Sequence, residues 1–164
     1  KCVNCHLCIA VCPVKFCNDG SSGHIKINSE LCIGCGKCIE ACPHNARKGI
    51  DDFYAFIRDI KQGTKMVAIV APAIAATFNG QNMELNGWLK SLGIAEIFDV
   101  SFGAELTTKS YVDHIKTKKP SLMIAQPCPV LVNYCEIYRP ELLSHLAPLD
   151  SPMAHTMKMI KKYI

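Results

Sequence analysis

The pattern of apolar and polar positions changes near residue 65, and the two parts of the chain differ in character. Before that point, polar residues or cysteines interrupt the apolar residues every few positions. After it, apolar residues form continuous runs, and the run at residues 66–70 is typical of a strand buried on both faces. Similar runs at residues 96–100 and 122–125 predict a second and a third strand.

Helical periodicity fills the intervals after these strands. It predicts a helix that ends near Gly93 and another over residues 103–117. A further helix is expected to run through Val130 and Tyr138, and a last one over residues 152–163, where lysines gather at the end. Alternating strands and helices favour a parallel sheet with right-handed crossovers, so the predicted fold class is α/β with βαβαβ order.

Three segments follow from these patterns. Residues 1–48 form a small module, residues 49–64 a linking helix, and residues 65–164 the α/β domain. The linking helix is predicted from apolar residues at helical spacing, which are Phe53, Phe56, Ile57 and Ile60. Turn residues at 18–23 precede a short alternating strand at 24–28. The module has few apolar residues, so bound groups are expected to cross-link it.

The module contains the same cysteine spacing twice, C-x2-C-x2-C-x3-C-P. The two runs comprise Cys2, Cys5, Cys8 and Cys12, and Cys32, Cys35, Cys38 and Cys42. This spacing is typical of bacterial 4Fe–4S sites, in which the fourth cysteine of each run ligates the other cluster. We therefore expect a ferredoxin-like module with two 4Fe–4S clusters. One cluster is assigned to Cys2, Cys5, Cys8 and Cys42, and the other to Cys32, Cys35, Cys38 and Cys12.

Disulfides and zinc are the two alternatives for these cysteines. Disulfides would close short, strained loops, and no signal peptide indicates secretion. Zinc sites show separated C-x2-C pairs rather than a triplet followed by a fourth cysteine and a proline. The repeated spacing favours iron–sulfur clusters over both.

The charge and the cysteine content limit the partners and the compartment. The formal net charge is +4, but two clusters with their thiolates would each add about −2 and bring it near zero. Nucleic acid is therefore not expected as a partner. No apolar run is long enough to span a membrane. Eleven cysteines in such spacing indicate a reducing compartment, which we take to be the cytoplasm.

Three cysteines lie outside the repeats. Cys128 sits between two prolines just after the third predicted strand, where α/β sheets place their sites. The sequence leaves two alternatives for it, a ligand or a buried thiol in a tight turn. Cys17 and Cys135 are interpreted as packed thiols.

The order of motifs along the whole chain resembles that of the iron-only (di-iron) hydrogenase large subunit family. The two cysteine runs are followed by matching stretches at residues 71–73, 92–94, 97–99, 102–107, 128–129, 138–142 and 151–153. The resemblance implies that Cys128 is the first of four cysteines that hold the 4Fe–4S part of the active-site cluster. The other three would lie beyond Ile164, so we expect the chain as given not to assemble the hydrogen-activating site, and Cys128 to be a free thiol.

Two departures from the family pattern concern proton supply. Active enzymes of the family carry a proton-relaying cysteine directly before this ligand, where this chain has Pro127. A carboxylate pair of the family falls on Ser110 and Tyr111. The resemblance is thus greatest to the sensory or regulatory branch, whose members are often fused to signalling domains.

These observations lead to two functional hypotheses. In the first, the chain carries electrons through two 4Fe–4S clusters to a hydrogenase-type site started by Cys128. In the second, it is an electron-transfer or hydrogen- or redox-sensing module without turnover. The expected partner is a redox protein or a fused signalling or catalytic domain. A nucleotide-dependent oxidoreductase is not favoured, because the sequence contains no nucleotide-binding fingerprint.

Overall fold

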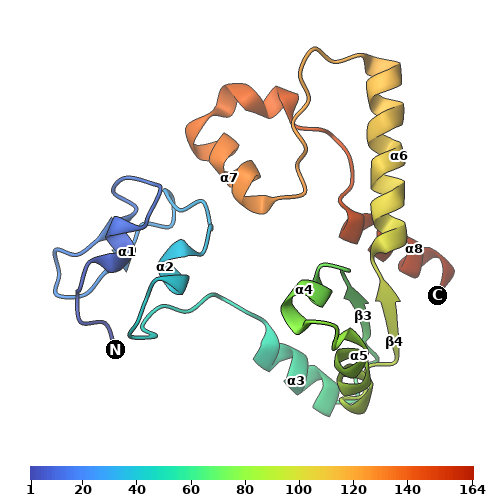
Figure 1. Cartoon of the computed structure of the whole chain (residues 1–164), viewed down its shortest axis with the longest axis horizontal. Helices are drawn as coiled ribbons and strands as arrows, with labels where there is room; N and C mark the ends of the chain where they lie inside the picture. The colour runs from blue at the N-terminus through green and yellow to red at the C-terminus, as the bar shows by residue number, and fades with distance from the viewer. The chain divides into compact units, whose positions relative to one another are not determined.

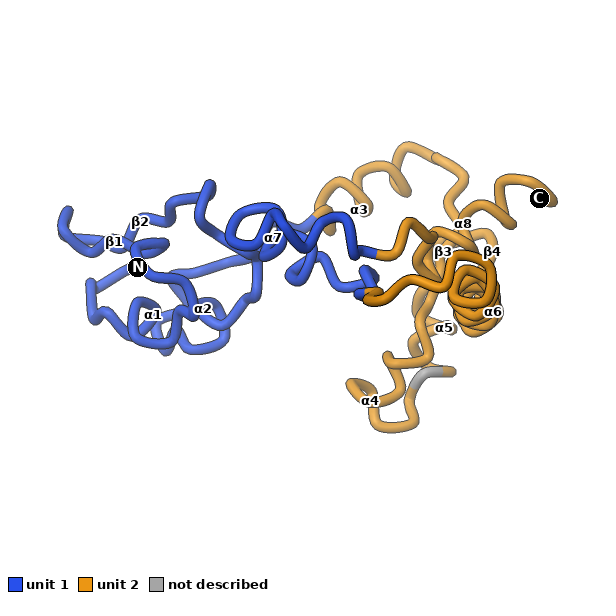
Figure 2. Tube along the Cα trace, turned by 90° about the horizontal axis from the view of Figure 1, so that it is seen from above, with its two compact units in different colours: residues 1–51, 124–146 blue, residues 52–123, 147–164 orange. Residues whose placement is uncertain are grey.

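The computed structural model describes residues 1–164, with the exception of the side chain of Asn82. The chain forms two compact units, which Figure 2 shows in different colours. Residues 1–51 and 124–146 make up the first unit, and residues 52–123 and 147–164 make up the second. The chain therefore leaves the first unit, returns to it at residue 124 and leaves it again after residue 146.

The first unit contains one short helix in each cysteine repeat. These are α1 (Leu7–Ala10) and α2 (Lys37–Glu40). Each follows a residue in the left-handed conformation, His6 at φ 63° and Gly36 at φ 77°. A left-handed residue turns the chain sharply, so each cysteine loop leads directly into its helix.

A short antiparallel pair of strands lies between the two repeats. β1 (Asn18–Asp19) pairs with β2 (Lys26–Ile27). The connecting turn is held by Asp19, whose carboxylate accepts hydrogen bonds from the backbone N–H and the hydroxyl of Ser21, at 2.9 and 3.0 Å. The predicted strand at 24–28 is thus shorter than expected, and the first residues of the predicted turn form its partner.

The returning segment of the first unit contains α7 (Pro129–Tyr138) and the 3-10 helix η1 (Pro140–His145). Proline at the first position of each helix is favourable, since that N–H would have no partner inside the helix. The two ends of the segment meet, because Ile124 forms a parallel bridge with Leu146.

The second unit is built around two parallel strands, β3 (Val67–Val70) and β4 (Glu96–Asp99). Val67 lies opposite Glu96, and Val70 lies opposite Asp99. The helices of this unit are α3 (Phe53–Lys61), α4 (Ile74–Phe78), α5 (Asn82–Ser91), α6 (Ser101–Lys118) and α8 (Pro152–Tyr163). None of the helices in the described part of the chain has both the length and the apolar character needed to cross a bilayer.

Helix α8 crosses α6 close to the beginning of both helices (Figure 1). Gly103 allows this contact, because a Cβ atom there would collide with the backbone of Pro152 and the hydroxyl of Thr156. The hydroxyls of Thr107 and Thr156 are buried and donate to carbonyl groups of their own helices, each at 2.9 Å. The crossing therefore leaves neither hydroxyl without a partner.

The helix predictions are confirmed closely, whereas two strand predictions are wrong in detail. Residues 122–125 do not join the sheet, which has two strands within the described residues; Ile124 pairs with Leu146 instead. Prolines at positions 120 and 127 flank this short stretch, and each removes a backbone donor. β3 is also less buried than expected, with Val67 at 38% exposure, because a two-stranded sheet offers few neighbours to cover it.

The domain limits predicted from the motifs differ from the compact units at one segment. Residues 124–146 belong to the predicted α/β domain, but they pack in the unit that contains the cysteine repeats. Two hydrogen bonds join them to it: Tyr138 Oη donates to the carbonyl of Leu31 at 2.7 Å, and Asn133 Nδ2 donates to the carbonyl of Ile33 at 3.3 Å.

Candidate iron–sulfur sites

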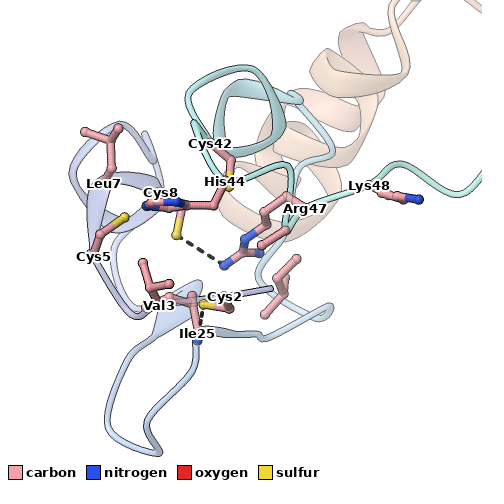
Figure 3. A pocket seen from close by; sticks show the side chains of 12 residues that line it. Cys2, Val3, Cys5, Leu7, Cys8, Ile25, Cys42, His44, Arg47 and Lys48 are labelled. Carbon is pink, nitrogen blue, oxygen red and sulfur yellow. Dashed lines mark hydrogen bonds between the residues drawn. The ribbon is translucent and has the colours of Figure 1, made fainter.

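Four cysteines from both repeats line the first of two cysteine-lined cavities in the first unit. Cys2 and Cys5 come from the N-terminal loop, Cys8 from α1, and Cys42 from the turn after α2. The cavity has a volume of about 240 Å³, and Figure 3 shows the four side chains around it. The fourth cysteine of the second repeat thus lies with the first three of the first repeat.

Hydrogen-bond donors reach the sulfur atoms of this first site. The backbone N–H of Ile25 donates to Cys2 Sγ at 3.5 Å and, as the largest cause, lowers the pKa of the Cys2 thiol. The backbone N–H groups of Ala46 and His44 lower the pKa of Cys42 in the same way. Such donors stabilise thiolates, which are the form that binds iron.

Arg47 adds a positive charge to the first site. Its Nη2 donates to Cys8 Sγ at 3.4 Å, as the dashed line in Figure 3 indicates. The guanidinium also contributes to the lowered pKa of Cys2 and of Cys42, after the backbone donors. A permanent cation beside a cluster favours its more negative, reduced form.

The second cavity collects the complementary set of cysteines. It is lined by Cys32, Cys35 and Cys38 of the second repeat and by Cys12 of the first. Its volume is about 20 Å³, so it is much smaller than the first. Burial, the largest cause, raises the pKa of the Cys38 thiol.

Cys17 is a fifth thiol in the second cavity. It is 3% exposed, and its Sγ donates to the carbonyl of Asn28 at 3.6 Å. Burial, followed by the neighbouring Cys32 and Cys12, raises the pKa of Cys17 to about 12, so this thiol stays protonated. The interpretation of Cys17 as a packed thiol agrees with its burial, but its place in the second site was not predicted.

The donor sets fit a multinuclear cluster better than a single metal ion. Within the described residues, no three histidine, cysteine or carboxylate side chains are arranged to hold one ion. The first cavity is instead lined by four thiols and the second by five, and a cubane needs four. The second cavity is the smaller one, so its thiols must move outward to admit a cluster.

Comparison with known proteins identifies the family. A model of the 4Fe–4S binding domain matches residues 25–48, and another matches residues 1–15. The model of the C-terminal domain of the iron-only hydrogenase large subunit matches residues 64–164. The chain belongs to the iron-only hydrogenase large subunit family.

Individual relatives match different parts of the chain. The periplasmic [Fe] hydrogenase large subunit of Nitratidesulfovibrio vulgaris is 28% identical over 99% of this chain and 43% of its own length. Iron hydrogenase 1 of Clostridium pasteurianum is 33% identical over 53% of this chain and 17% of its own length. Protein NrfC of Escherichia coli is 44% identical over 24% of this chain and 18% of its own length. The chain therefore spans less than half the length of each of these relatives.

Cys128, the further candidate ligand, is not among the residues that line the two cavities. It is exposed and precedes the first residue of α7. Its neighbour Pro127 carries no exchangeable proton. Cys135, seven residues further along α7, is completely buried, which confirms its interpretation as a core residue.

The hydroxyl pair at the family's carboxylate positions lies on α6. Ser110 Oγ donates to the carbonyl of Leu106 at 2.8 Å, so its proton is engaged within its own helix. In this conformation Ser110 does not offer a proton to another group.

Sequence reasoning missed three residues that contact the sites, namely Arg47, Asn133 and Tyr138. Arg47 lies five residues after Cys42. A basic residue this close to the end of a cysteine run was a signal that its charge could lie near a site. Asn133 and Tyr138 lie 100 and 107 residues from the loop atoms they contact. Local patterns in the sequence do not predict contacts between residues that lie so far apart along the chain.

Proposed function

We propose that this chain binds two 4Fe–4S clusters and transfers single electrons through them to a hydrogenase-type site started by Cys128. One cluster would be held by Cys2, Cys5, Cys8 and Cys42, and the other by Cys12, Cys32, Cys35 and Cys38. When bound, such a cluster supplies reversible one-electron transfer.

The observation that carries this proposal is the exchange of the fourth cysteines. Cys42 lines the first cavity and Cys12 lines the second, although each belongs to the other repeat. A crossed set is expected for paired cubanes and is not needed for two independent metal ions. The chain's own donors, such as the N–H of Ile25, would then hold the thiolates in their charged form.

The proposal is tested by iron and acid-labile sulfide analysis of protein purified without air, together with EPR of the reduced form. We expect about eight irons per chain and a spectrum of two interacting clusters. About four irons would contradict the two-cluster proposal. About twelve would mean that Cys128 also takes part in a metal site.

A second candidate is hydrogen or redox sensing without turnover. It is supported by Pro127, which replaces a proton-relaying group, and by the engaged hydroxyl of Ser110. In the full-length protein, a Pro127→Cys variant should raise the rate of hydrogen evolution from reduced methyl viologen if proton supply limits turnover. An unchanged rate would favour the sensing function only if the unmodified protein still responds spectroscopically to hydrogen.

We also propose a reducing, cytoplasmic compartment and a redox protein or fused domain as the partner. The compartment is supported by the cysteine spacing, because thiols that hold clusters must stay reduced. The relative from Nitratidesulfovibrio vulgaris is named periplasmic, so cell fractionation with an antibody against the chain is the direct test. Recovery in the periplasmic fraction would contradict this part of the proposal.

A further inference from the structure

Helix α7 reaches the second cysteine site through one peptide group. Asn133 Nδ2, on α7, donates a hydrogen bond to the carbonyl oxygen of Ile33 at 3.3 Å. The N–H of the same peptide, which belongs to Gly34, donates to Cys32 Sγ at 3.4 Å. The amide of Asn133 is thus linked to a ligand sulfur by two consecutive hydrogen bonds.

Consecutive hydrogen bonds of this kind strengthen each other. A donor at the Ile33 carbonyl polarises the peptide and makes the Gly34 N–H a better donor, by roughly 10–30% per bond. Stronger N–H···S bonds withdraw charge from a ligand sulfur and raise the reduction potential of its cluster.

We propose that Asn133 is a positioning residue that raises the reduction potential of the second cluster and makes it depend on the placement of α7. This inference rests on the proposed ligand set of the second site. Its basis is the chain of atoms from Asn133 through the Ile33–Gly34 peptide to Cys32, all within the first unit.

The backbone at Gly34 suits this relay. Its φ of 75° lies in the left-handed region, where a residue with a side chain would be strained. This conformation directs the N–H toward Cys32 while the carbonyl of Ile33 faces α7. The helix that carries Asn133 begins directly after Cys128, so any movement of Cys128 with its helix would alter the relay.

Tyr138 provides a matched control on the same helix. Its hydroxyl donates to the carbonyl of Leu31 at 2.7 Å. The N–H of that peptide belongs to Cys32 and donates to the carbonyl of Ser29 at 3.3 Å, not to a sulfur. Tyr138 therefore attaches α7 to the same loop, but no pair of consecutive hydrogen bonds leads from its hydroxyl to a ligand sulfur.

The experiment is an anaerobic EPR redox titration of the whole chain with both clusters bound. In an Asn133→Leu variant, the ratio of reduced to oxidised second cluster at the wild-type midpoint should fall about threefold, or about 28 mV at 59 mV per tenfold. Asn133→Asp should lower the reduction potential of the second cluster further, because a carboxylate repels the Ile33 carbonyl. The first cluster should not shift, and a Cys5→Ser chain, altered only at the first site, assigns the two transitions.

The outcomes separate the relay from a purely structural role. If Asn133→Leu and Tyr138→Phe leave the second potential equally unchanged, the inference is wrong and Asn133 only holds the helix. Fewer than about eight irons in the wild-type chain would instead contradict the proposed function.

Two further measurements keep the test decisive if the leucine variant does not bind both clusters. Asn133→Ser is a milder change, and the short serine side chain cannot reach the Ile33 carbonyl. We expect the same fall in the potential of the second cluster as in Asn133→Leu. In wild-type chain with ¹⁵N-labelled glycine, pulsed EPR of the reduced second cluster should show coupling to a glycine amide nitrogen. Absence of this coupling would overturn the relay through Gly34.

Discussion

The two cysteine sites share one motif but have opposite surroundings. The first is wide, about 240 Å³, and has the guanidinium of Arg47 and backbone N–H donors beside its cysteines. The second is narrow, about 20 Å³, and contains the buried thiol of Cys17. Identical ligand spacing therefore does not give identical sites, because Arg47 and Cys17 lie outside the spaced cysteines.

This difference predicts different redox behaviour. A cation stabilises the more negative, reduced form of a cluster. Arg47 lines the first cavity, whereas the residues that line the second include no lysine or arginine. We expect the first cluster to have the higher potential and to be reduced first. Asn133 would reduce the difference between the two potentials by raising the potential of the second cluster.

The largest effects are expected from the crossed ligands. Cys42→Ala should remove the first cluster, and Cys12→Ala the second, so iron should fall from about eight to about four per chain in each variant. Cys17 lies beside Cys12, so the second variant should also carry Cys17→Ala to prevent substitution by a nearby thiol. EPR of each variant identifies the surviving cluster; loss of the first signal in the Cys12 variant would contradict the assignment.

Metal removal should distinguish the wider site from the narrower one. With a chelator such as bipyridyl under argon, the first cluster should lose iron several-fold faster, because its cavity is wider and its ligand Cys5 is exposed. The decay of the two reduced EPR signals gives both rates. Equal rates would mean that loss requires opening of the whole unit rather than access to each site.

Removal of the cation should reduce the difference in potential. Arg47→Gln should lower the midpoint potential of the first cluster by roughly 60 mV, a tenfold change in a one-electron equilibrium, through the loss of one nearby charge. Arg47→Lys, which keeps the charge, is the control and should recover most of the potential. A larger shift of the second cluster would show that Arg47 acts elsewhere.

The smallest effect is expected at Cys17. Cys17→Ala removes a buried thiol from the second site and should destabilise it by about 1 kcal/mol. The temperature of cluster loss, followed by the absorbance of the bound clusters, should fall for the second cluster only. An equal fall for both clusters would contradict the assignment of Cys17 to the second site.

Local signals in the sequence predicted which cysteines lie together and most helices. The cysteine spacing predicted that the fourth cysteine of each repeat lies with the first three of the other repeat, as the two cavities show. That these thiols hold clusters stays a prediction. Helical periodicity similarly predicted α7 and α8.

Contacts between distant segments were not predictable in this way. The stretch at 122–125 has the composition of a strand, but its pairing with Leu146 depends on where the whole segment packs. Asn133 has an ordinary amide side chain, and only the position of α7 places it against Ile33. Arg47 likewise acquires its role from the turn that brings it back to Cys8.

The discontinuity of the first unit has a consequence for biosynthesis. The cysteine repeats are synthesised before residues 124–146, and residue 146, the last of the unit, follows 95 residues after residue 51. At 5–20 residues per second, roughly 5–20 s pass before α7 can be placed against the loop of the second site. During that time the second set of thiols lacks this contact and is more accessible to proteins that deliver iron and sulfide. Translation speed and cluster insertion are therefore linked in this chain.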